Sequence, residues 1–88
     1  MLNDIMNGIM KTNHKLTITI PTDSAIEHYL WQHPMFTQTD NSSDLVVFSY
    51  DGVIPPLAKI SQLLAMFEPT EYTISKSTTG ISFIVWSL

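Results

Sequence analysis

The chain has 88 residues, a formal net charge of −4, four lysines against eight carboxylates, and neither arginine nor cysteine. Without arginine it lacks the planar guanidinium that reads bases and grips phosphates. Without cysteine it has no disulfide framework, thiolate nucleophile or cysteine-based zinc site. Residues 1–88 suffice for one domain and are too few for two separate cores.

Composition also bears on class and location. A hydrophobic content of 44% indicates a folded chain rather than a disordered one. The acidic balance and the few scattered lysines argue against direct binding of nucleic acid. No apolar run approaches the ~20 residues of a membrane span, and the first residues do not resemble a signal peptide. We therefore expect a cytoplasmic protein with no membrane association, metal or cofactor.

Residues 1–10 contain a stripe of apolar side chains at steps of three and four, which predicts a short amphipathic helix. A helix of this length is not stable alone in water, so it must dock on something. The alternative is that residues 1–10 are only loosely attached to the folded body. The stripe consists of Leu2, Ile5, Met6, Ile9 and Met10.

Residues 15–20 alternate strictly between polar and apolar, which predicts a strand with one buried face. Ser24 and Glu27 form a capping-box pattern that starts a helix, and Pro34 ends it. Residues 37–44 are polar and are predicted to form a solvated loop. Residues 45–50 are apolar on both alternations, as in a central strand.

A second helix begins at Pro55-Pro56 and ends before Pro69. Its apolar face is predicted to contain Leu57, Ile60, Leu63, Leu64 and Phe67. Residues 71–76 and 81–88 then read as a hairpin across residues 77–80, in which Gly80 would supply positive φ.

The elements together predict an α+β fold, an α/β two-layer sandwich. Its mixed four-stranded sheet has the order β-α-β-α-β-β, preceded by the short N-terminal helix. Both strand–helix–strand crossovers should be right-handed. Two helices cover only one face of a sheet, so the other face must meet the N-terminal helix, another chain or solvent.

The histidines and carboxylates are the side chains of this sequence that could carry chemistry. His28 and His33 are five residues apart and so diverge around a helix, while His14 simply precedes a strand, so we expect no metal site. In a parallel sheet, Asp23 and Asp51 would meet at one rim, where they could hold Mg²⁺ or assist proton transfer. Lys76 could join them there if its strand runs the same way. Aspartates at these positions are more commonly a helix cap and a turn, and we expect no catalysis.

Two tryptophans point to protein binding instead. Trp31 falls on the outer helix face with Glu27 and His28, where it could anchor a partner. Trp86 shares a strand face with other apolar residues that the two long helices do not reach, which suggests a self-interface or cover by the N-terminal helix.

The sequence therefore predicts a small acidic, non-catalytic interaction protein that occupies a partner protein's surface, with a homodimer as a further possibility. A basic groove on the partner would suit the carboxylates in or beside the predicted loops, which are Asp40, Asp44, Asp51, Glu68 and Glu71. The alternatives are a small Mg²⁺-dependent enzyme at the Asp23/Asp51 rim and a nucleic-acid-binding domain of the same topology.

Overall fold

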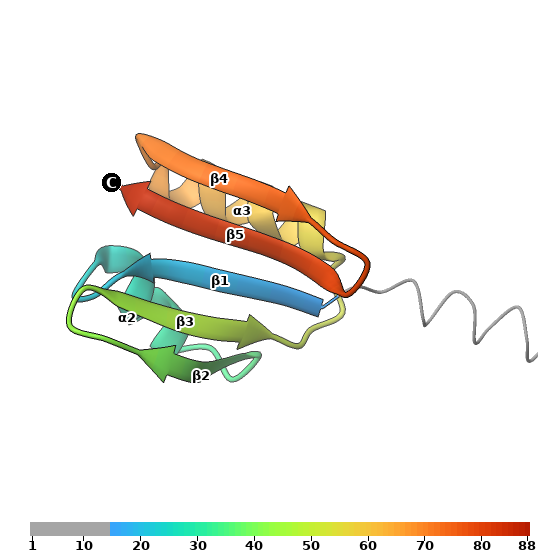
Figure 1. The fold of residues 1–88 in the computed structure, drawn as a ribbon, viewed down its shortest axis with the longest axis horizontal. Coiled ribbons are helices and arrows are strands. Elements are labelled where there is room, and N and C mark those ends of the chain that lie inside the picture. The colour runs from blue at the N-terminus through green and yellow to red at the C-terminus, as the bar shows by residue number, and fades with distance from the viewer. Residues whose placement is uncertain (1–14) are drawn as a thin grey trace, which may run out of the picture.

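The computed structural model describes residues 15–88, and the helix predicted within residues 1–10 lies outside them. Five strands form one mixed sheet, with two helices on one face (Figure 1). The elements are β1 (Lys15–Pro21), α2 (Ala25–Trp31), β2 (Phe36–Asn41), β3 (Leu45–Tyr50), α3 (Pro56–Phe67), β4 (Glu71–Lys76) and β5 (Gly80–Ser87). The α+β class is confirmed.

The sheet has one strand more than the sequence predicted, and the extra strand changes its topology. β2 occupies most of the segment predicted as a loop, and it pairs antiparallel with β3. The order is β2-β3-β1-β5-β4, in which only β1 and β5 run parallel. Consequently β3 lies antiparallel to β1, with Leu16 opposite Tyr50 and Pro21 opposite Leu45.

Both crossovers pass behind the sheet in Figure 1 and are right-handed, as expected for such connections. α2 joins β1 to β2, and α3 joins β3 to β4. The sequence predicts that the first helix leads directly to the strand at residues 45–50. In the structure the first crossover ends on β2 instead.

The core lies between the helices and one face of the sheet. On β1 the predicted alternation is confirmed, because Leu16, Ile18 and Ile20 are fully buried. Their neighbours across the sheet, Phe48 and Phe83, are buried as well. The opposite face, which we call the open face, carries many hydroxyl side chains together with a few apolar ones.

The capping box of α2 differs slightly from the predicted form. Ser24 Oγ accepts the backbone N–H of Glu27 at 3.2 Å, as expected for an N-cap. The carboxylate of Glu27 accepts the backbone N–H of Asp23 instead of that of Ser24. Asp23 has a φ of 64°, a left-handed conformation that aspartate tolerates better than most residues.

Gly80 is needed for a different reason from the one predicted. It does not have positive φ. A Cβ at this position would collide with the backbone carbonyl group of Lys15 on the neighbouring strand. Gly80 therefore lets β5 begin directly against β1, where the two residues pair.

Candidate interaction surface

Six carboxylates gather at one end of the sheet, which we call the acidic end. This is the end where β1 and β5 finish, where the β2–β3 hairpin turns and where β4 begins (Figure 1). The backbone N–H of Thr22 donates to the carbonyl of Asp44 at 2.9 Å and so ties the hairpin to the end of β1. The residues are Asp23, Glu27, Asp40, Asp44, Glu68 and Glu71.

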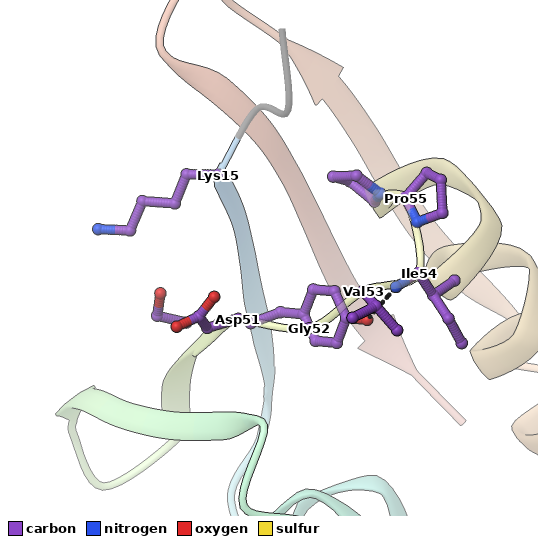
Figure 2. Close-up of a pocket in the computed structure, with 9 residues that line it drawn as sticks. Lys15, Asp51, Gly52, Val53, Ile54 and Pro55 are labelled. Carbon is purple, nitrogen blue, oxygen red and sulfur yellow. Dashed lines mark hydrogen bonds between the residues drawn. The ribbon is translucent and has the colours of Figure 1, made fainter. Parts of the chain in front are cut away.

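Four of the five loop carboxylates predicted to meet a partner thus lie at one end. Asp51 is the exception, because it follows β3 and β3 runs opposite to β1. Asp51 lies at the other end, beside Lys15 (Figure 2). Lys76, the last residue of β4, also lies at that end, next to the start of β5. We call it the lysine end.

The lysine end contains an open hollow of about 640 Å³, which is lined by Lys15 and by residues 49–56 (Figure 2). The hydroxyl of Tyr50 accepts the backbone N–H of Ile54 at 3.2 Å and holds the loop in place. A Cβ at Gly52 would collide with the Tyr50 ring, so this position needs glycine. In Figure 2, Lys15 and Asp51 extend toward the same side of the hollow. Its lining contains neither histidine nor a second carboxylate.

A second hollow of about 460 Å³ shares Lys15 with the first. Hydroxyl groups of the β4–β5 hairpin line it together with Lys15 and Lys76. Several of those hydroxyls are already engaged in the turn, where Ser77 Oγ donates to the carbonyl of Gly80 at 3.2 Å. These hydrogen bonds stabilise the hairpin.

Trp31 is a large exposed aromatic residue close to the acidic end. It is 57% exposed at the end of α2. Its indole N–H donates to Glu27 Oε2 at 3.2 Å, and its ring meets that of Phe48 edge-on, with centroids 5.4 Å apart. His28 is exposed on the same helix. The structure therefore brings Trp31 and Glu27 together on the exposed side of α2.

Trp86 belongs to a different surface. It lies on the open face near the end of β5, is 49% exposed, and donates its indole N–H to Thr73 Oγ1 at 2.9 Å across the β4–β5 pair. Ile84 lies on the same face and is partly buried. Whether Trp86 contacts another chain or the N-terminal segment stays a prediction.

The catalytic rim considered in the sequence does not form. Because β1 and β3 are antiparallel, Asp23 and Asp51 lie at opposite ends of the sheet and cannot share an ion or a proton. Within residues 15–88, no three side chains of the metal-binding types come together. The predicted rim required the strands at residues 15–20 and 45–50 to be parallel. They are antiparallel, because β2 lies between them in the sequence.

His33 packs at the end of α2. Its ring lies 4.1 Å from that of Tyr29 between centroids, and its Nδ1 is 2.8 Å from the Tyr29 carbonyl oxygen. This arrangement closes the end of α2 against Tyr29.

Comparisons of the chain with protein-family models, with curated proteins and with solved structures found no match. Among the helices in residues 15–88, none is both long enough and apolar enough to span a membrane.

Proposed function

We propose that this chain is a small acidic, non-catalytic interaction protein that acts by occupying the surface of a partner protein. Such action is typical of antitoxins, immunity proteins, anti-CRISPR proteins and other inhibitors or accessory proteins of phage or plasmid type. A cytoplasmic location belongs to the same proposal, because a chain without cysteine has no need of an oxidising compartment.

The observation that carries the proposal is the exposed Trp31 held beside Glu27. A tryptophan is a favourable interface anchor when it offers a large contact area and loses little rotamer freedom on binding. Here the indole already donates a hydrogen bond to Glu27 and packs against the Phe48 ring in a T-shaped arrangement, and both contacts limit its freedom. The partner should therefore offer an apolar hollow for the indole.

The neighbouring charges indicate what surrounds that hollow on the partner. Asp23 and Asp44 lie at the same end of the molecule as Glu27, so a basic rim on the partner would be complementary. A nucleic acid is less suitable, since Lys15 and Lys76 are the exposed lysines of the described chain and both lie at the far end.

Affinity capture from the native host, with the wild-type chain as bait, tests the proposal. Any captured protein is purified, and its Kd is measured against the wild type, Trp31→Ala and Trp86→Ala. We expect Trp31→Ala to raise Kd by about thirtyfold, the effect of losing an interface hot spot. Trp86→Ala is the matched control, because it removes an equally large, half-exposed indole from the other surface.

Two results would contradict the proposal. One is that no partner is recovered while the purified chain shows measurable turnover of a substrate. The other is a partner that binds Trp31→Ala as tightly as it binds the wild type. Circular dichroism of each variant confirms that the fold is intact before binding is compared.

A further inference from the structure

β4 is the outermost strand of the sheet, and no other described segment pairs with its free edge. All six of its residues are exposed, among them the apolar Tyr72 and Ile74. From Tyr72 to Lys76 its pairing with β5 is regular. A regular edge strand with aromatic and β-branched residues, and without proline or a central charge, is a template for another strand.

β2, the other edge strand, is protected in a way that β4 is not. Its residues after Phe36 are all polar or acidic, from Thr37 to Asn41. Its pairing with β3 is interrupted by a bulge whose extra residue lies in β2 itself, whereas the irregularity in the β4–β5 pair, next to Glu71, has its extra residue in β5. Irregularities and charged side chains are the usual means of preventing edge-to-edge association. The contrast singles out β4 as the edge that can accept a strand.

We propose that β4 pairs antiparallel with β4 of a second copy of this chain and forms a symmetric dimer with a continuous ten-stranded sheet. A two-fold axis perpendicular to the sheet keeps the helices of both copies on one face. Opposed residues must then point to the same face, which leaves two central registers. Either Thr73 or Ile74 lies opposite its own counterpart.

The side chains of β4 are compatible with this arrangement in both registers. Ile74 lies opposite Tyr72 of the second copy in the register centred on Thr73, and opposite its own counterpart in the other, so an apolar contact forms at the centre in either case. Glu71 lies opposite a serine in both registers. Neither register therefore places two like charges opposite each other.

The charge distribution of the whole molecule acts in the same direction. Antiparallel pairing of β4 places the acidic end of one copy beside the lysine end of the other, which reduces the repulsion between two chains of net charge −4. The inference goes beyond the proposed function and does not use Trp31 or α2, so either can fail without the other.

Sedimentation equilibrium of the full chain over a range of concentrations tests the dimer. We expect the wild type to show a concentration-dependent dimer. Ile74→Lys and Ile74→Glu should each weaken it by about tenfold or more, because each replaces the apolar contact at the centre of the seam with two like charges close to the two-fold axis.

The two variants separate local pairing from general repulsion. Ile74→Lys makes the chain less negative and Ile74→Glu makes it more negative, so an effect of net charge alone would have opposite signs in the two. Thr37→Lys and Thr37→Glu make the same additions of charge on β2, the other edge, and should leave the dimer unchanged. Circular dichroism verifies that all variants remain folded.

A wild-type chain that remains monomeric up to about 1 mM would overturn the proposal. A dimer that Ile74→Lys and Ile74→Glu leave intact, or that the two Thr37 variants weaken as much, would also overturn it. That second result would place the contact on another surface, such as the open face around Trp86.

Discussion

Lys59 is the only charged side chain that is buried within residues 15–88, where it is 4% exposed. Its ammonium group lies 5.7 Å from the centroid of the Phe36 ring and 5.4 Å from that of Tyr50. Gln62 Oε1 accepts a hydrogen bond from it at 3.0 Å. The hydrocarbon stem thus serves as core packing, and the charge is stabilised by two aromatic faces and one amide.

Truncation of Lys59 should therefore lower the free energy of unfolding by more than truncation of an exposed lysine would. We expect Lys59→Ala to lower the free energy of unfolding by about 2 kcal/mol, because it removes buried methylene groups and the cation–π contacts. Lys59→Met, which keeps most of the stem, should cost less than about 1.5 kcal/mol. Urea denaturation measures both. Lys15→Ala, at an exposed site away from β4, is the control, and equal effects of the two alanine variants would show that the stem of Lys59 contributes nothing.

Helical periodicity in the sequence could not identify this arrangement. It assigned Leu57 to the core, whereas Leu57 is 43% exposed and Lys59 takes its place among the buried residues. Ile60 and Leu63 were assigned correctly. The exact rotation of α3 depends on where the rings of Phe36 and Tyr50 lie, and these belong to strands β2 and β3, whose positions a helical pattern does not contain.

Trp31 should contribute little to the stability of the fold if its main role is to bind a partner. Its ring contacts Phe48 only by an edge and remains largely in solvent. We expect Trp31→Ala to lower the free energy of unfolding by about 1 kcal/mol, the value of one aromatic pair. Thermal denaturation provides the measurement. A variant that fails to fold would show that Trp31 is a core residue and would remove the best anchor of the proposed interface.

The residue that ends helix α3 has a strained backbone conformation. Glu68 adopts the left-handed conformation, with φ 45° and ψ 56°, and its backbone N–H donates to the Leu64 carbonyl at 2.9 Å. This position after a helix is the one that glycine usually occupies, because a Cβ disfavours the left-handed region.

Glycine should consequently be better than glutamate at this site. We expect Glu68→Gly to raise the free energy of unfolding by about 0.5–1 kcal/mol, the relief of strain exceeding the added flexibility of the unfolded chain. The same substitution two residues earlier, Met66→Gly, lies inside the helix and should cost about 1 kcal/mol. Opposite signs in urea denaturation support the interpretation, and a loss of stability in both variants would refute it.

The missed strand shows why element order is harder to predict than element type. β1, both helices, β3 and the β4–β5 hairpin carry apolar periodicity, and each was predicted near its observed bounds. β2 carries almost none, since only Phe36 in it is buried and the rest is held by pairing with β3. Once β2 is present, β3 returns as its hairpin partner and must run antiparallel to β1. One polar edge strand thus reversed the predicted pairing.

At the scale of the whole molecule, that reversal decides which carboxylates meet. The sequence identified Asp40, Asp44, Glu68 and Glu71 individually, and the fold places them together with Asp23 and Glu27. It also separates Asp51 from all of them. Their gathering could not be predicted without the strand order, because they come from three separate stretches of the chain, residues 23–27, 40–44 and 68–71.

The separation of charges along the sheet makes a prediction that needs no identified partner. We expect an oligolysine peptide, titrated at low salt into the ¹⁵N-labelled chain, to shift amide resonances at Asp23, Asp40 and Asp44 and to leave those near Lys76 unchanged. Attraction between exposed charges decays over roughly 8 Å at physiological ionic strength, so the shifts should shrink as salt is raised.

Matched charge removal locates the effect. Asp40→Asn combined with Asp44→Asn should weaken binding of the peptide several-fold, because both charges belong to the acidic end. Asp51→Asn makes the same chemical change at the lysine end and should have little effect, although it also lowers the negative charge. If Asp51→Asn weakens binding as much per charge removed, the peptide responds to net charge alone, and the acidic end has no special role in attracting a basic partner.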